Sequence, residues 1–281
     1  MNTVAVIHAR VSSSRLKHKV IRNFCGIPML SFQFLRVKRV KSINKIIVIT
    51  TNRQEDNKIV QLAIDNNVDF FRGSQNDVLD RIFFSVRKLK PKFIIRISGD
   101  NPLIDPKVIN LVIKKLYTKK YDHISSFAKP SYPYGVGCAG FTFDALDKAF
   151  LKTKKKLDRE NVEPFMLKSK TIKTLYLQAP KKLHYPNISV TVDTLSDFEK
   201  VQNCGKFLFE KYGMNFYTEE IINYFENCKI LIVANGDVGL KCVKYLVSKK
   251  EELIGVVLSK KDEYSLNLKI KEASVLNPKD I

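Results

Sequence analysis

The sequence lacks the features that mark membrane-spanning, secreted or disulfide-rich proteins. None of its apolar runs reaches the roughly 18 to 20 residues that a membrane span needs. The segment from Met1 to Ile7 has neither a basic leader nor a small-residue cleavage site, so we expect no secretion signal. Five cysteines are present, none of them in a CxxC pair, and an odd number leaves one unpaired. These absences predict a cytoplasmic protein with reduced thiols and no membrane span.

Acidic residues are scarce relative to basic ones, because 28 Asp and Glu stand against 49 Lys and Arg and give a net charge of +21. Such an excess is typical of nucleic-acid-binding proteins. However, 38 of the basic residues are Lys and only 11 are Arg, whereas recognition of bases and phosphates favours the planar Arg side chain. A general bias toward Lys, Ile and Asn explains this composition without a specific nucleic-acid partner. The net positive charge still produces an electrostatic field that attracts anionic small molecules such as nucleotides.

Short apolar runs rich in β-branched residues alternate with longer amphipathic stretches along most of the chain. The expected strands are 4–9, 45–51, 93–98, 123–127, 173–177 and 188–192, and the expected helices are 28–40, 55–66, 77–89, 106–117, 161–169 and 196–211. Pro106 stands in the first turn of its helix, and Ser196 is expected to cap the last helix with Glu199 three residues on. The alternation predicts a doubly wound, mostly parallel α/β sheet over residues 1–226.

A second pattern begins near Cys228, where the apolar run 229–234 is followed by the glycine turn 235–239, a helix over 240–248 and a strand over 253–258. This order predicts the beginning of a βαβ unit. The segment 227–281 is too short for a complete nucleotide-binding domain, so we expect an appendage or a truncated module. Its glycine pattern is more typical of a tight strand-to-helix turn than of a ligand site.

Three polar clusters follow predicted strands, and ligands of open α/β sheets gather at the carboxyl ends of strands. The first, residues 9–19, combines hydroxyls with Arg and Lys, as a polyphosphate site requires, although a solvated basic loop explains it equally well. No Walker A motif is present. Asp100 and Asp193 follow two other strands, where each could hold a metal or simply form a turn or helix entry. Together the clusters resemble the parts of a phosphoryl-type transfer site.

Six motifs stand in order along the first 205 or so residues: Ile7-His8-Ala9-Arg10 with Ser13-Ser14-Arg15-Leu16 and Lys19-Val20, Gly26–Leu30, Arg72-Gly73-Ser74 with Asp77–Arg81, Gly99–Asp105, Arg159–Val162 with Pro164, and Val192-Asp193-Thr194 with Asp197. The ordered set resembles the sugar nucleotidyltransferases. These include the cytidylyltransferases that activate sialic and ketodeoxyoctonic acids, and the spore-coat polysaccharide biosynthesis protein F group. The resemblance is strongest to the spore-coat group.

The resemblance implies a nucleotide-diphospho-sugar transferase (GT-A-like) fold that binds CTP and Mg²⁺. The implied reaction transfers a nucleotidyl group to a sugar hydroxyl for polysaccharide biosynthesis and releases pyrophosphate. Matched positions place Arg10, Ser13, Arg15 and Lys19 at the triphosphate, Arg72, Ser74 and Asp77 near the base and ribose, Asp100 and Asp193 on the metal, and Arg159 and Glu160 near the acceptor sugar. In the implied in-line attack on the α-phosphate, Arg15, Lys19 and Asp100 carry the catalysis. A homodimer is left open.

The sequence also departs from the family pattern. Ser12 and Lys17 replace the usual glycine and proline of the first loop, and Gly137 and Ala139 stand where the spore-coat group carries two acids. The absence of the two acids at positions 137 and 139 predicts altered acceptor recognition or activity. The tail resembles the start of a formyltransferase-type Rossmann domain but lacks that family's catalytic residues. Two alternatives remain open: a glycosyltransferase of similar fold that uses a nucleotide-sugar, and a basic nucleic-acid-binding protein.

Overall fold

The computed structural model describes residues 2–13, 15–154 and 156–227, together with the segments 230–233, 253–257 and 274–275. The chain divides into two compact units, Met1–Ile222 and Asn223–Ile281. Helix α9 (Thr218–Glu226) runs across this division, and the boundary expected after residue 226 lies at the end of the helix. The assignment of residues 227–281 to a partial Rossmann-like module stays a prediction.

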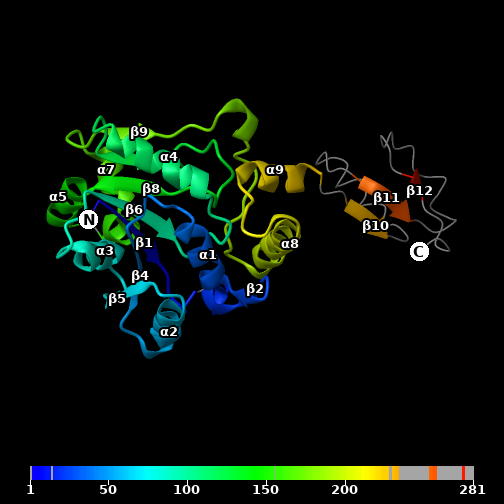
Figure 1. Cartoon of the computed structure of the whole chain (residues 1–281), viewed down its shortest axis with the longest axis horizontal. Helices are drawn as coiled ribbons and strands as arrows, with labels where there is room; N and C mark the ends of the chain where they lie inside the picture. Colours follow the sequence, from blue (N-terminus) through cyan, green and yellow to red (C-terminus); the bar gives the residue numbers. More distant parts are fainter. Residues whose placement is uncertain are drawn as a thin grey trace. The chain divides into compact units, whose positions relative to one another are not determined.

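Seven strands form one sheet in the first unit (Figure 1). Their spatial order is β5 (Asp69–Gly73), β4 (Lys45–Thr51), β1 (Thr3–His8), β6 (Phe93–Ser98), β8 (Ala139–Thr142), β7 (His123–Ser125) and β9 (Thr174–Tyr176). β5, β4, β1 and β6 pair in parallel, as do β7 and β9, whereas β8 is antiparallel to both of its neighbours. The predicted doubly wound, mostly parallel sheet is confirmed.

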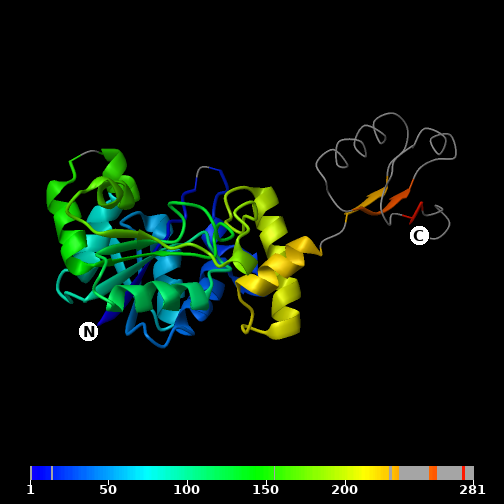
Figure 2. The same ribbon diagram turned by 90° about the horizontal axis from the view of Figure 1, so that it is seen from above.

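Helices cover both faces of this sheet (Figure 2). On one face lie α1 (Met29–Lys38), α2 (Asn57–Asp65) and α4 (Pro106–Tyr117), and on the other lie α3 (Val78–Val86), α5 (Phe143–Lys152) and α7 (Glu163–Lys168). The short α6 (Lys156–Asn161) joins α5 to α7, and α8 (Leu195–Tyr212) comes before α9. Within the described part of the chain, no helix has both the length and the apolar character that crossing a bilayer requires.

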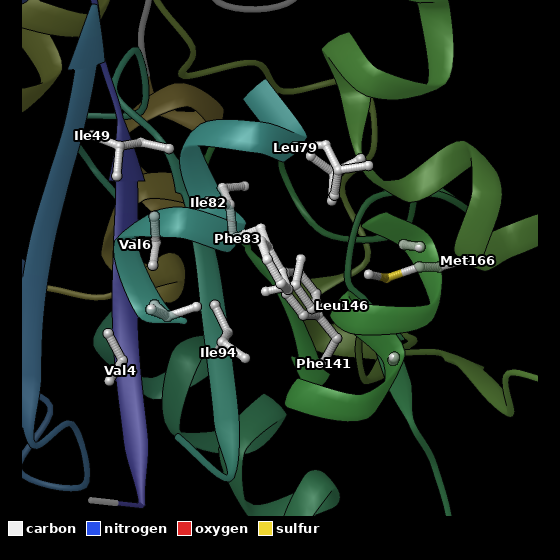
Figure 3. Close-up of a cluster of buried hydrophobic side chains, with 14 of the residues drawn as sticks. Val4, Val6, Ile49, Leu79, Ile82, Phe83, Ile94, Phe141, Leu146 and Met166 are labelled. Atoms are coloured by element: carbon white, nitrogen blue, oxygen red, sulfur yellow. The ribbon is translucent and has the colours of Figure 1, made fainter. Parts of the chain in front are cut away.

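The hydrophobic core between the sheet and helices α3, α5 and α7 fixes the positions of the strand ends (Figure 3). Val4 and Val6 of β1 pack there with Ile82 of α3 and Leu146 of α5, and none of the four is exposed to solvent. Burying a side chain of this size contributes about 1.5 to 3 kcal/mol. Because side chains alternate along a strand, the same face carries His8, two residues beyond Val6, at the end of β1. The packing of β1 in this core therefore fixes the position of His8 at the edge of the sheet where the strand ends.

Two sequence predictions about residues 188–197 are wrong. The segment 188–192 is not a sheet strand, because its β-pairing with the described residues is limited to an isolated bridge between Ser189 and Tyr134. Helix α8 begins at Leu195 rather than after Ser196, and its N-cap is Thr194. Thr194 and Asp197 form a capping box, each side chain bonding the other residue's backbone N–H, so the first turn has no need of Ser196.

Several elements were missed by the pattern of apolar residues. Strand β8 reads Ala-Gly-Phe-Thr, with one large apolar residue, and it is held in the sheet by its neighbours rather than by its own composition. Gly140 in this strand is required by packing, because a Cβ there would lie 2.6 Å from Val112 Cγ1 of α4. Strand β5 and helix α5 were also not anticipated, together with the hairpin β2 (Asn23–Phe24) and β3 (Ile27–Pro28).

The second unit contains a three-stranded parallel sheet in the order β10 (Ile230–Val233), β11 (Leu253–Val257) and β12 (Ser274–Val275). The parallel pairing of β10 with β11 agrees with the expected βαβ unit, which needs a crossover between its strands. The helix expected over 240–248 and the glycine turn over 235–239 lie outside the described residues.

Candidate active site

The loop after β1 is anchored by a buried carboxylate from the next crossover. Asp56, which is not exposed, accepts hydrogen bonds from Val11 N at 2.7 Å and from Thr51 N at 3.2 Å. Within the loop, Val11 O accepts from Ser13 N at 3.0 Å and from His18 N at 3.1 Å. These bonds hold Val11, Ser13 and His18 close to the strand end, and the short 3-10 turn Lys19–Ile21 follows directly after His18.

Asp100 and Asp193 meet although they lie on separate segments. Gly99 lets the loop after β6 approach the end of β1, because a Cβ at this position would lie 2.9 Å from both Ala9 Cβ and His8 O. Asp100 follows at once, and its carbonyl accepts from Val192 N at 2.9 Å. The extended segment that sequence reasoning took for a strand therefore places Asp193 beside Asp100.

Lys19 joins the two aspartates. Its Nζ lies 3.1 Å from Asp100 Oδ2, 3.0 Å from Asp193 Oδ1 and 2.7 Å from Val192 O, so all three N–H donors are used. The Lys19 side chain is 10% exposed, whereas those of Asp100 and Asp193 are 25% and 28% exposed. Arg15 Nη2 adds a further ion pair to Asp193 Oδ1 at 3.1 Å. Two partly open carboxylates are thus held together by a largely buried ammonium group.

A cavity of about 440 Å³ opens in front of this cluster. Of the residues predicted to form the site, it is lined by Arg10, Ser13, Arg15, Lys19, Asp100, Glu160 and Asp193. Arg81 of α3 also lines it and is 3% exposed; burial, and then the charge of Arg10, lower the pKa of its guanidinium. The cavity wall therefore carries four cationic side chains and three carboxylates, a balance that suits a polyanionic ligand bound together with a metal.

The other predicted site residues line neither this cavity nor the one beside it. Arg72 donates to Thr51 O, Asn57 Oδ1 and Arg53 O, which ties β5 to the loop after β4. Asp77 caps α3, accepting from Asp80 N at 2.8 Å.

Two further predicted residues also hold the walls of the first cavity. Arg159 is paired with Asp77 and donates to Thr153 O at 3.0 Å, so it links α3 to the segment before α6. The Ser74 carbonyl accepts from Arg81 Nη1. These contacts hold in place the segments that form the wall of the first cavity.

A second cavity of about 500 Å³ adjoins the first. The two share His8, Arg15, Ser98, Asp100 and Asp193 in their walls. The second cavity is more apolar, and it is bordered by Phe127, Tyr132, Tyr134, Pro164 and Leu167. Aromatic and apolar walls with a few polar groups are typical of sites for small organic ligands. The two aspartates therefore stand at the junction of a polar cavity and a more apolar one.

Two of the residues that line the second cavity form a buried ion pair. Arg96 Nη1 of β6 lies 3.1 Å from Glu163 Oε1 of α7, and Ser125 Oγ donates to Glu163 Oε2 at 3.0 Å. Burial raises the pKa of Glu163 and outweighs the opposing effect of Arg96. Burial and then Arg96 lower the pKa of His8, which is neutral at pH 7 in consequence.

Comparison with known proteins decides the family. A family model described as cytidylyltransferase matches residues 4–222, a span that contains every residue of both cavities. The chain belongs to this family. The match confirms the resemblance inferred from the motifs, and it favours nucleotidyl transfer over the glycosyltransferase and nucleic-acid-binding alternatives.

Relatives of this cytidylyltransferase include an uncharacterized protein of Methanocaldococcus jannaschii, 36% identical over 200 residues that cover 71% of this chain and 81% of the relative. The spore coat polysaccharide biosynthesis protein SpsF of Bacillus subtilis is 26% identical over 216 residues, or 74% of this chain and 86% of the relative. Among solved structures, a cytidylyltransferase from Leptospira borgpetersenii has a TM-score of 0.75 at 25% identity, covering 82% of this chain and 99% of that one.

Three functional candidates of this cytidylyltransferase were missed by sequence reasoning: Arg81, Arg96 and Glu163. Arg81 is the last residue of the motif Asp77–Arg81, but the sequence does not show in which direction an Arg near the start of an amphipathic helix points. Arg96 offered a clearer signal, since a charged residue inside the apolar run 93–97 needs a buried partner. Glu163 follows the motif Arg159–Val162 directly, yet only the packing of α7 on β6 identifies it as that partner.

The buried His123 of this cytidylyltransferase predicts acid sensitivity. Burial, and then the charge of Arg96, lower its pKa to about 4 in the folded protein, against about 6.5 when unfolded. The unfolded state therefore binds the proton first, and stability that is complete above about pH 6.5 is lost as the pH falls toward 4. From pH 7 to pH 5 we expect the wild type to lose about 2 kcal/mol more than His123→Gln in urea denaturation.

His8 also has a lowered pKa, but it is present in both proteins and cancels in this comparison. Equal losses in the wild type and in His123→Gln would contradict the assignment of the acid sensitivity to His123.

Proposed function

We propose that this chain transfers a cytidylyl group from CTP to a sugar hydroxyl, with release of pyrophosphate, in the synthesis of a surface glycan. One observation carries the proposal: a cation-lined cavity and a more apolar cavity meet at Asp100 and Asp193, beside Arg15 and Lys19. A transfer between two substrates needs this arrangement, because the reacting groups must approach each other at one point.

We assign the nucleotide to the first cavity. Arg10, Arg15 and Arg81 are placed to offset the charge of the triphosphate, and Ser13 offers a hydroxyl. Arg72, Ser74 and Asp77 are assigned an indirect role, since their hydrogen bonds fix the loops and the start of α3 that border the cavity. The base and ribose would then lie along residues 75–78, of which Gln75, Asn76 and Val78 line the wall.

The carboxylates of Asp100 and Asp193 suit a divalent cation, which we propose to be Mg²⁺. Mg²⁺ is usually held by one or two carboxylates together with substrate phosphates and water. Both side chains are partly exposed and both face the two cavities. Among the described residues, no group of three or more His, Cys, Asp and Glu side chains could hold a metal without such help. Bound there, the cation would stabilise negative charge that develops on the phosphates.

We assign the acceptor sugar to the second cavity, in contact with the aspartates and Arg15. Bound in this cavity, the acceptor hydroxyl lies on the opposite side of the junction from the pyrophosphate, as an in-line attack on the α-phosphate requires. Arg15, in the loop after β1, lies at the junction. There it can stabilise the negative charge that develops on the leaving pyrophosphate. Glu160 lines the first cavity and Arg159 neither one, so we give both a role in shaping the boundary between the cavities.

A panel of nucleoside triphosphates tests the proposal. In a thermal-shift assay with Mg²⁺, we expect CTP at 100 times its Kd to stabilise the protein by about 2.7 kcal/mol, and ATP, GTP and UTP to have little effect. Pyrophosphate release should then require CTP, Mg²⁺ and a sugar acceptor together. A protein that is stabilised equally by all four nucleotides, or by none, would contradict the proposal.

A further inference from the structure

Three segments of the chain are rich in basic residues and contain no acidic one. They are 87–92, which leads from α3 into β6, 114–120, which ends α4 and leads toward β7, and 168–173, which leads from α7 into β9. Eleven of their 19 residues are basic, against 49 of the 281 residues in the whole chain. A general bias toward Lys does not produce such a concentration in segments that lie far apart in the sequence.

The topology of the sheet brings the three segments together. β8 is antiparallel to both β6 and β7, and β9 is parallel to β7, so β6, β7 and β9 run in the same direction and their amino ends lie at one edge. Contacts join the segments there: Lys92 Nζ lies 5.6 Å from the ring centroid of Tyr117, and Lys173 O accepts from Asp122 N at 2.9 Å. We call residues 87–92, 114–120 and 168–173 the basic surface.

The charge of the basic surface is not compensated within the described part of the chain. All eleven basic side chains are exposed, and none of them forms an ion pair with a described acid. The helix dipole accounts for Lys114, Lys115 and Lys168, which stand in the last turns of α4 and α7. It does not account for the seven lysines that follow the helix ends. Such a cluster of unpaired charge attracts an anionic partner.

Two of these lysines occupy backbone positions that favour glycine. Lys90 has a φ of 40° and Lys119 a φ of 57°, both in the left-handed region. Their backbone N–H groups close the ends of α3 and α4, because Lys90 N donates to Val86 O at 2.9 Å and Lys119 N donates to Leu116 O at 3.0 Å. Gly or Asn adopts this conformation at lower cost. A departure from the local preference at two matching positions is expected where the side chain has a function.

A hollow of about 420 Å³ lies within the basic surface. Lys90, Lys92 and Lys119 line it, so ammonium groups of two different segments border the same space. Two carboxylates, Asp122 and Asp144, line it as well, and the lysines outnumber them. The hollow therefore favours an anionic group such as a phosphate.

The composition of the basic surface favours a lipid bilayer over a nucleic acid. Ten of its eleven cations are Lys, whereas recognition of nucleic acids favours Arg. Leu89 and Tyr117 stand among the lysines and are 37% and 43% exposed. An apolar side chain and an amphipathic Tyr ring between lysines are typical of a surface that rests on the headgroups of a bilayer.

We propose that the basic surface docks on the anionic face of a lipid bilayer, with its lysines on the lipid phosphates. This inference goes beyond nucleotidyl transfer and does not depend on it. His8 and Ser98, at the carboxyl ends of β1 and β6, line both cavities of the candidate active site. Docking at the amino ends of the strands therefore leaves both cavities uncovered.

Cosedimentation of the full chain with lipid vesicles tests the proposal. At an ionic strength of about 0.15 M, we expect the wild type to bind vesicles of phosphatidylglycerol and phosphatidylcholine in equal amounts, and not vesicles of phosphatidylcholine alone. Salt at about 1 M should release it, because the Debye length falls to about 3 Å. Lys90→Gly/Lys119→Gly/Lys120→Gln/Lys170→Gln should bind on the order of 10²- to 10³-fold more weakly.

The matched control removes four exposed lysines from other elements: Lys58→Gln/Lys148→Gln/Lys206→Gln/Lys211→Gln. It has the same net charge as the first variant, so the pair separates the basic surface from the overall charge of the chain. We expect the control to bind the mixed vesicles within about fivefold of the wild type, the effect of about one lysine. The first variant should not melt below the wild type, because glycine relieves the two left-handed lysines.

Three results would overturn the proposal. A wild type that does not bind the mixed vesicles, or that binds phosphatidylcholine alone equally well, has no anionic lipid partner. A control variant as weak as the first variant would assign binding to net charge instead of the basic surface. If duplex DNA of random sequence binds through the same four lysines and the vesicles do not, the partner is a nucleic acid. CTP binding is measured separately, so none of these results bears on the proposed function.

Discussion

Lys19→Met should melt about 4 to 8 °C below the wild type when neither nucleotide nor metal is present. The ammonium is the shared counter-charge of Asp100 and Asp193, and it donates all three of its hydrogen bonds. Without it, two neighbouring carboxylates repel each other, at a cost of about 2 kcal/mol after allowance for their partial exposure. For a unit of this size, each kcal/mol shifts the melting temperature by about 2 to 4 °C.

The same substitution should also change the response to Mg²⁺. Since the carboxylates of the variant keep only the exposed Arg15, on Asp193, as a counter-charge, Mg²⁺ alone should restore much of its lost thermal stability. The wild type should respond to Mg²⁺ only together with CTP. Turnover should fall by about 10²- to 10³-fold, the usual effect of removing a group that stabilises developing charge.

Lys17→Met provides the matched control, because Lys17 lies in the same loop, is exposed and lines neither cavity. It should leave the melting temperature, the Mg²⁺ response and turnover nearly unchanged. A Lys19→Met protein that behaves like Lys17→Met would show that the ammonium is not the counter-charge of the two aspartates.

Asp100→Asn should lower metal-dependent pyrophosphate release by about 10³-fold or more while the fold is kept. The substitution preserves the shape of the side chain and removes the charge that faces both cavities. In thermal-shift titrations, the extra stabilisation that Mg²⁺ gives to CTP binding should disappear, whereas the metal-independent part should remain. The two measurements together separate loss of metal binding from loss of nucleotide binding.

The control for this variant is Asp65→Asn, which alters an exposed carboxylate on α2 that is bonded to Gln61 and lies outside both cavities. It should retain full activity. Full activity in Asp100→Asn as well would exclude Asp100 from the metal site.

The sequence predicted the parts of the site that lie at the ends of strands. β1, β4 and β6 are recognisable because a buried parallel strand needs a mostly apolar run, which is a local property; in β6 only Arg96 interrupts the run before Ser98. The polar residues that follow such runs lie at one edge of the sheet by topology alone. For this reason Arg10, Arg15, Lys19 and Asp100 were found from the sequence, and the structure brings them to the walls of one cavity. Asp193 lines the same cavity, but it was predicted from a strand that is not formed, and the hydrogen bond from Val192 N to Asp100 O places it there.

The direction in which helical side chains point could not be predicted in the same way. Arg159 and Asp77 belong to motifs of the family, yet they pair with each other across 82 residues of sequence instead of lining a cavity. Arg81, four residues after Asp77, does reach the cavity. Spacing along a helix determines which residues share a face, but it does not determine what that face meets.

By itself, the sequence determined the α/β sheet, the loops at its strand ends and the family to which the chain belongs, because short-range periodicity and ordered motifs encode all three. The tertiary structure alone decided that Lys19 bridges Asp100 and Asp193. It also decided that Arg96, whose cross-strand neighbour is the uncharged Ala139, forms its ion pair with Glu163. The physical reason is sequence distance. Lys19 and Asp193 are 174 residues apart and Arg96 and Glu163 are 67 apart, so these contacts exist only after β1, β6 and α7 have packed around the common core.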